Sequence, residues 1–258
     1  MVPRGWFAGL LLAVGSLLAT SGCGTEPPIE SAEDLVRAMH ARYAGKWYEA
    51  LTFVQTASFY GEDGTITQDQ IWYEAMHVPG RLRIDIAPLE NGRTVVYAND
   101  SLYRFRDGEF ANAGPGLNPL LLLGFDVYGQ PAERTLEQLE TLDFDLSKFR
   151  ADEWQGRSVH VVGADAGDEH SAQFWVDQER LLFVRLLQPA GPGGERTQEI
   201  QFNEYEPLGG GWIAPEVVFM TDGNLTLREV YRNVRANVDL GAGLFDVETW
   251  QPAGWVER

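Results

Sequence analysis

The sequence predicts a mainly β protein with helices, folded as one domain around an antiparallel sheet of about eleven strands. Most of the chain after residue 50 alternates apolar and polar residues with a period of two, which is typical of half-buried strands. Clusters of Gly, Asp, Asn and Pro interrupt this alternation at short intervals, as expected for hairpin turns. Two other segments have the three- and four-residue spacing of a helix. The predicted strands are Leu51–Tyr60, Ile66–Met76, Arg81–Ala87, Arg93–Ala98, Ser101–Arg106, Ser158–Val162, Ala172–Asp177, Leu181–Gln188, Arg196–Tyr205, Trp212–Thr221 and Leu225–Val234.

The third predicted strand shows the alternation most clearly. Leu82, Ile84 and Ile86 lie on one face, because successive side chains of a strand point to opposite faces. The charged residues Arg81, Arg83 and Asp85 alternate with them and face the other way. One face of the sheet is therefore predicted to be apolar.

The segment from Ser31 to Trp47 is predicted to be an amphipathic helix. Ser31 with Asp34 three residues later resembles a capping box, which satisfies backbone N–H groups at the start of a helix. Because its apolar residues form a single stripe, this helix must pack on another element. The stripe consists of Leu35, Val36, Met39, Tyr43 and Trp47.

A helical insertion is predicted in the middle of the chain. Thr135–Phe149 has leucines at helical spacing and forms its second helix. Before it, the glycine-flanked run Gly116–Gly124 contains Leu120, Leu121, Leu122 and Leu123. Three interpretations of these leucines stand: a lid over a cavity, an exposed apolar loop that contacts membrane or cargo, and a buried helical turn.

The first residues have the pattern of an export signal. Arg4 precedes an apolar stretch, Trp6–Leu18. This stretch is too short to cross a bilayer as a helix, which requires about 20 apolar residues. Small residues at positions 20–22 then precede Cys23, the only cysteine of the sequence. Because an exported protein with one cysteine cannot form an internal disulfide, this thiol requires another explanation.

The pattern around Cys23 resembles the bacterial lipobox, in which signal peptidase II cuts before a cysteine that carries diacylglycerol. We predict that residues 1–22 are the signal peptide, that Cys23 is lipidated, and that residues 23–30 tether a domain of residues 31–258. Thr20 departs from the motif, where Leu is usual, and an ordinary signal cut nearby with an incidental Cys23 thiol is the alternative. Gly24 in place of Asp implies, by lipoprotein-sorting rules, an outer-membrane location facing the periplasm.

The composition excludes some partners. The chain has 20 Lys and Arg against 38 Asp and Glu, a formal net charge of -18. Such an acidic surface opposes binding to nucleic acid and to anionic headgroups, so we predict no nucleic-acid partner.

Catalytic and metal-binding motifs are absent from the sequence. It contains no Gly-x-Ser-x-Gly elbow, no phosphate-binding Gly-rich loop before a helix and no His-Glu-x-x-His. Its four histidines are scattered, and the acidic run around Asp168 lacks the full calcium-loop pattern. We therefore predict that the protein is not an enzyme and requires no metal or cofactor.

Several segments, in their order along the chain, resemble the LolA/LolB-like outer-membrane lipoprotein-sorting superfamily. None of the short strings is specific alone, and the resemblance covers essentially the whole chain after the tether. It is carried by the N-terminal amphipathic helix, Phe53–Thr56, Pro79–Ile84, Val96–Tyr103, Phe174–Leu182, and Phe245 with Asp246. The resemblance implies an open antiparallel half-barrel whose concave face is covered by the N-terminal helix and the helical insertion. In that family the concave cavity is apolar and accepts acyl chains.

Apolar strand residues are the candidates for lining such a cavity, with plain core packing as the alternative for each. They are Leu82, Ile84, Ile86, Tyr103, Phe105, Phe174, Leu182, Val184 and Leu186.

Two functions are predicted on this basis. The first is a membrane-anchored lipoprotein of the cell envelope that binds acyl chains of lipids or lipoproteins, for carriage or acceptance. The alternative is an envelope sensor or interaction module that uses the same fold to bind a protein partner.

Overall fold

The computed structural model describes residue 1 and residues 28–241, 243–248, 250–252 and 254–256. The predicted signal peptide, Cys23 and the first part of the tether lie outside the described residues. No helix among the described residues is long and apolar enough to cross a membrane.

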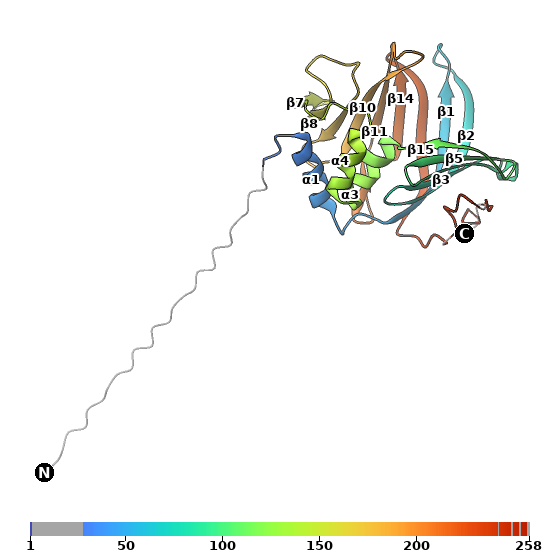
Figure 1. Cartoon of the computed structure of the whole chain (residues 1–258), viewed down its shortest axis with the longest axis horizontal. Coiled ribbons are helices and arrows are strands. Elements are labelled where there is room, and N and C mark those ends of the chain that lie inside the picture. The colour runs from blue at the N-terminus through green and yellow to red at the C-terminus, as the bar shows by residue number, and fades with distance from the viewer. Residues whose placement is uncertain (2–27, 242, 249, 253, 257–258) are drawn as a thin grey trace.

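Thirteen antiparallel strands form one open sheet in the described part of the chain (Figure 1), which confirms the predicted mainly β, open architecture. The two strands beyond the eleven predicted are both at the edges of this sheet. A separate two-stranded ribbon consists of β12 (Glu206–Leu208) and β13 (Gly211–Ile213). The thirteen strands are β1 (Ala50–Tyr60), β2 (Ile66–His77), β3 (Arg81–Ile86), β4 (Arg93–Ala98), β5 (Ser101–Arg106), β6 (Glu109–Pro115), β7 (Phe149–Trp154), β8 (Arg157–Val162), β9 (Gln173–Asp177), β10 (Phe183–Ala190), β11 (Arg196–Asn203), β14 (Glu216–Thr221) and β15 (Asn224–Ala236).

The strand order explains why a helical insertion is needed. The order is β6-β5-β4-β3-β2-β1-β15-β14-β11-β10-β9-β8-β7, so the first six strands progress outward to one edge and the rest return from the opposite edge. The first and last strands pair in the middle of the sheet, from Leu51 opposite Ala236 to Phe59 opposite Leu227. The chain between β6 and β7 must therefore cross the sheet, and it does so over the concave side (Figure 1).

This crossing consists of short helices. They are α2 (Pro119–Leu121), the π-helix η2 (Leu122–Asp126), α3 (Val127–Gly129) and α4 (Ala132–Glu140). The predicted second helix began at Thr135 and ran to Phe149, but the observed helix ends earlier and Phe149 begins β7. A single 3-10 turn, η1 (Leu89–Asn91), lies between β3 and β4.

The N-terminal helix α1 (Ala32–Tyr43) begins as predicted, with Ser31 as its cap. The Ser31 hydroxyl accepts a hydrogen bond from the Asp34 N–H at 3.1 Å. The helix ends before Trp47, at a turn in which Gly45 has a positive φ of 70°. Trp47 still contributes to the predicted apolar contact, because its ring stacks on Tyr128 of α3 at 4.0 Å between centroids.

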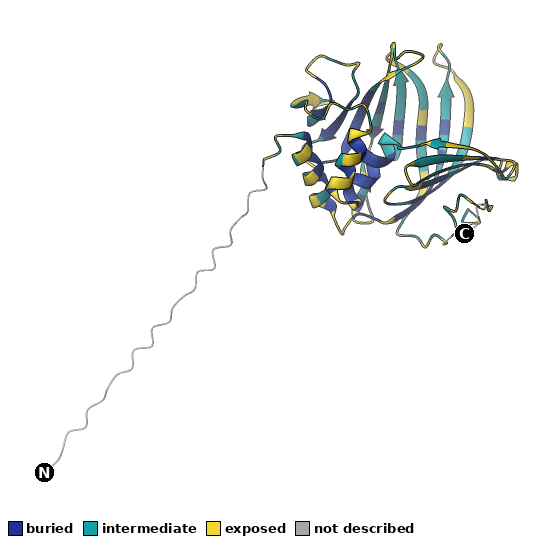
Figure 2. Cartoon of the chain, in the orientation of Figure 1, coloured by how far each residue is buried: buried dark blue, intermediate teal, exposed yellow. Residues whose placement is uncertain are grey.

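The helices pack over one half of the concave face. The predicted apolar stripe of α1 is buried against α3, α4 and the sheet (Figure 2). Tyr128 joins the helices to the strands, since its hydroxyl accepts a hydrogen bond from the Phe183 N–H at 2.9 Å. The half of the sheet that contains β1 to β4 remains without helices over it (Figure 1).

The chain after β15, residues 238–256, is named the C-terminal segment here. It covers the convex face of β3, where the alternation placed the charged residues. Arg83 donates two hydrogen bonds to the Asp85 carboxylate, at 2.8 and 2.9 Å, and this ion pair is buried. Arg83 also donates to the carbonyl oxygens of Leu244 and Gln251 at 3.1 and 2.6 Å. The C-terminal segment is thereby held to the sheet.

Candidate functional site: a cavity on the concave face

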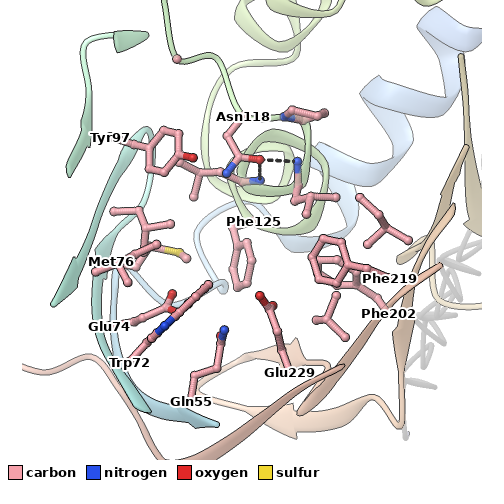
Figure 3. A pocket seen from close by; sticks show the side chains of 18 of the residues that line it. Gln55, Trp72, Glu74, Met76, Tyr97, Asn118, Phe125, Phe202, Phe219 and Glu229 are labelled. Atoms are coloured by element: carbon pink, nitrogen blue, oxygen red, sulfur yellow. Dashed lines mark hydrogen bonds between the residues drawn. The ribbon is translucent and has the colours of Figure 1, made fainter. Parts of the chain in front are cut away.

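A cavity of about 520 Å³ lies on the part of the concave face that the helices leave uncovered (Figure 3). Cavities of this size are typical of small-molecule sites. Strands β1 to β4 form one side of the cavity, and β11, β14 and β15 form the other. Its lining is mostly aromatic and aliphatic. The lining residues are Phe53, Gln55, Trp72, Glu74, Met76, Leu82, Ile84, Tyr97, Leu102, Pro115–Leu121, Phe125, Gln188, Gln198, Ile200, Phe202, Val217, Phe219, Leu227, Glu229 and Tyr231.

The segment 115–121, which leaves β6 and enters the helices, crosses beside the cavity, and we name it the crossing segment. It lies close to β5, because a Cβ atom on Gly116 would come within 2.3 Å of the Leu102 backbone nitrogen. Asn118 ends its extended part: the Asn118 Oδ1 atom accepts hydrogen bonds from the N–H groups of Leu120 and Leu121 at 2.9 and 3.4 Å. The close approach at Gly116 and the Asn118 cap, whose hydrogen bonds Figure 3 shows, together position the segment.

Three polar side chains interrupt the apolar lining. Glu74 of β2, Gln55 of β1 and Glu229 of β15 come from three neighbouring strands and point into the cavity (Figure 3). They are 5%, 1% and 8% exposed. Neither carboxyl group forms an ion pair with a described residue, and the cavity lining contains no Arg, Lys or His.

Burial changes the ionisation of both carboxyl groups. It raises the pKa of Glu229 to about 8, and the neighbouring Gln55 amide offsets this effect in part. Burial also raises the pKa of Glu74 well above its usual range, and the charge of Glu229 adds to this effect. The Gln55 Nε2 atom forms no well-oriented hydrogen bond with the described residues. The cavity therefore contains polar groups whose interactions are incomplete.

Two of the nine residues that we expected to line a cavity do so. Leu82 and Ile84 contact it, and Ile86 lies farther along the same face of β3, outside the lining. Three others, Phe174, Leu182 and Leu186, are at most 1% exposed and belong to the core under the helices.

The other three face the convex side of the sheet. Tyr103 and Phe105 pair with Val96 and Thr94, and both contact the cluster that contains Trp250. Since the neighbouring Leu102 lines the cavity, the expected face of this strand was wrong. Val184 packs with convex-side residues because a bulge in β10 between Phe183 and Arg185 breaks the alternation.

The four leucines form the buried helical turn that was one of the three interpretations. Leu121, Leu122 and Leu123 are at most 6% exposed, so they are not an exposed membrane-contact loop in this structure. Leu120 and Leu121 line the cavity. Binding of an envelope protein partner stays a prediction.

The residues that sequence reasoning missed include the carboxyl groups. Glu74 alternates with Trp72 and Met76, and Glu229 alternates with Leu227 and Tyr231, so each lies on an otherwise apolar strand face. An acidic residue at such a position is a signal that could have identified them. The described residues contain no group of three His, Cys, Asp or Glu side chains arranged to hold a metal ion.

Comparison of the whole fold with solved structures gives related architectures. A LolA superfamily protein from Nitrosomonas europaea matches with a TM-score of 0.55 and 11% identity, over 85% of this chain and 99% of the other. This chain has the LolA fold.

An outer membrane lipoprotein-sorting protein domain from Vibrio parahaemolyticus matches this chain equally well. The TM-score is 0.55 and the identity 11%, over 83% of this chain and 95% of that domain. A DUF1329 family protein from Desulfovibrio piger gives a TM-score of 0.54 and 14% identity, over 85% and 98% of the two chains. No family model matches the sequence, and no curated protein matches it significantly. At these identities the similarity concerns the fold.

Proposed function

We propose that this protein is a lipid-anchored carrier or acceptor that binds acyl chains of lipids or lipoproteins in the concave cavity. Binding is reversible and involves no covalent step. In this proposal the protein acts in the cell envelope, at the periplasmic side of the outer membrane. The observation that carries the proposal is the apolar cavity of about 520 Å³ on the uncovered half of the sheet.

The physical argument concerns the surface that the fold leaves unfilled. A curved sheet has a concave face that must be covered, and here the helices cover only half of it. The cavity lining is rich in rings and aliphatic chains, including Phe53, Phe219 and Leu227. Transfer of an acyl chain from water to such a surface is favourable by about 0.8 kcal/mol per buried methylene.

The anchor in this proposal is Cys23. A diacylglycerol group on this cysteine holds the domain at the membrane, because two acyl chains make anchoring stable. Residues 23–30, which include adjacent prolines, form the tether. A tethered protein fits the receiving or resident role better than the role of a diffusing shuttle.

Filling the cavity tests the acyl-chain proposal. The Leu227→Trp variant places an indole in the cavity, and we expect it to reduce binding of a fluorescent monoacylglycerol at least tenfold. Val230→Trp is the matched control, since Val230 lies on the opposite face of the same strand. Fluorescence titration measures binding, and circular dichroism confirms that both variants fold. If the wild type binds no monoacylglycerol and carries no extractable lipid from membranes, the proposal is wrong.

The anchor is tested separately. Cys23→Ala is expected to release the protein from the membrane fraction and to abolish labelling by a metabolically incorporated acyl probe. Ser21→Ala, which keeps a small residue before the cut, is the control and should remain labelled. Membrane-bound, unlabelled wild-type protein would contradict lipidation at this cysteine.

A further inference from the structure

The cavity contains two carboxyl groups where an acyl-binding surface requires none. Glu74 and Glu229 are both buried, both face the cavity, and come from strands on either side of β1. Two ionised carboxylates in a low-dielectric site would repel each other. The site must therefore bind a proton or a cation that offsets this repulsion. No described Arg or Lys pairs with either group.

The position of these residues in the sheet brings them together. Gln55 of β1 is opposite Trp72 on one side and Tyr231 on the other. Glu74 is two residues from Trp72, and Glu229 is two residues from Tyr231. The three polar side chains thus form a diagonal across β2, β1 and β15, within one cluster (Figure 3).

Aromatic rings surround this cluster. Trp72, Tyr97, Phe125 and Tyr231 all line the cavity, and Phe53 stacks on Tyr231 at 4.3 Å between centroids. Carboxylates combined with ring faces are the environment that recognises organic ammonium groups. The Gln55 amide, 1% exposed and aimed into the cavity without a well-formed hydrogen bond, is an independent sign that a polar part of a ligand reaches this depth.

We propose that the cavity selects amphiphiles whose polar end is an ammonium group, which is bound between Glu74 and Glu229 while the alkyl chain contacts the apolar lining. This inference rests on the proposed function and specifies its ligand class. An anionic amphiphile of the same length is disfavoured, because its carboxylate meets two acidic groups and no cation. A neutral amphiphile retains the apolar contacts alone.

A series of three probes with the same alkyl chain tests this selectivity. Decylammonium, decanol and decanoate are titrated into the full-length protein by calorimetry at pH 7.5, below their micelle concentrations. Measurements at 0.15 M salt screen the general attraction of cations to an acidic protein. Decylammonium is expected to bind at least tenfold more tightly than decanoate, with decanol between them.

Variants assign the selectivity to the cavity. The double variant Glu74→Gln and Glu229→Gln keeps the shape of both side chains, and it should bring decylammonium and decanoate to within about twofold of each other. Glu109→Gln removes the same charge from the exposed edge strand β6 and should keep the wild-type preference. Thermal denaturation confirms that each variant is folded.

The outcomes separate this inference from the proposed function. Decanoate binding as tightly as decylammonium, or a preference that survives in the double variant, would overturn the ammonium site and leave acyl-chain binding intact. Failure of all three probes to bind the wild type would overturn both.

Discussion

At the scale of single residues, the two carboxyl groups of the cavity are its most unusual chemistry. An ionised Glu in an apolar site is unfavourable unless a cation or several hydrogen-bond donors accompany it. Glu74 and Glu229 have no cation among the described residues. Such groups are retained at a cost in stability, which is typical of ligand sites rather than of structural cores.

This cost predicts a pH dependence of stability. The pKa of Glu229 rises from 4.5 to about 8 on folding, so the native state keeps a proton that the unfolded chain releases between these values. The free energy of unfolding should therefore decrease as pH rises from 5 to 8. Glu74, facing it from β2, and Asp126, whose pKa burial raises to about 7, contribute with the same sign. Tyr97 and Tyr231 stay neutral in this range because burial raises the pKa of each.

The variant Glu229→Gln should flatten this decrease. We expect it to be more stable than the wild type at pH 8, by on the order of a few kcal/mol, and nearly equal at pH 5. Urea denaturation at several pH values measures the effect, and Glu109→Gln is the control because that side chain is exposed. A wild type equally stable at pH 5 and pH 8 would show that the carboxyl groups are better solvated than the structure indicates.

At the scale of elements, the crossing segment determines the shape of the cavity. It leaves the edge strand β6, approaches the β5 backbone at Gly116 and enters a helix at Asn118. The next residues form a π-helix, whose Gly124 packs against the Phe202 ring in a space that admits no larger side chain. The position of the backbone at Gly116 and Gly124 thus determines where the crossing segment forms one wall of the cavity.

Gly116→Ala tests the importance of this close approach. The added methyl would lie 2.3 Å from the Leu102 nitrogen, a backbone atom that cannot move alone, so the crossing segment must shift. We expect a loss of about 1–3 kcal/mol in unfolding free energy and weaker monoacylglycerol binding. Gly114→Ala is a matched control two residues away, since its Cβ would meet nothing within 4 Å. Equal effects of the two substitutions would exclude a specific role for the Gly116 contact.

The elements also show what the sequence could predict. Alternation located every interior strand of the large sheet, because these strands bury one face and their pattern reflects that burial. The capping-box pattern located the start of α1. The two strands of the large sheet that alternation missed, β6 and β7, are edge strands. Most side chains of β6 and half of those of β7 are exposed, which leaves little apolar face to produce a pattern.

The cavity was harder to predict than the sheet. In Ser101–Arg106 both Leu102 and Tyr103 are apolar, so alternation alone could not decide the face, and in β10 a bulge reversed Val184. Whether an apolar residue lines a cavity or a core depends on where the helices stop, which is a tertiary property. Leu186 and Leu82 have the same pattern and both contact the core, but only Leu82 also lines the cavity.

At the scale of the whole molecule, one buried polar network holds the chain end to the sheet. Sequence alternation placed Arg83 and Asp85 on the face opposite to the cavity, and the C-terminal segment covers them there. Thr94 Oγ1 donates to Asp85 at 2.7 Å and accepts from Trp250 Nε1 at 3.0 Å. The convex face of β3 and β4 is therefore closed, while their concave face remains available for a ligand.

Removing the carboxylate from this network should have a large effect. Asp85→Ala leaves the Arg83 guanidinium, 3% exposed, without its partner, and breaking such a buried pair costs about 3–5 kcal/mol. We expect this loss in urea denaturation, with faster hydrogen exchange and proteolysis confined to residues 238–256 under native conditions. Asp69→Ala on β2 is the control, because Asp69 is exposed and its carboxylate accepts a hydrogen bond from Ser58 at the surface. Replacing both members, as Arg83→Met with Asp85→Leu, should recover much of the global stability, because no unpaired charge remains. It should not restore protection of the C-terminal segment, since the hydrogen bonds from Arg83 to the carbonyl groups of Leu244 and Gln251 are lost. If protection returns with the apolar pair, packing rather than the polar network holds the chain end.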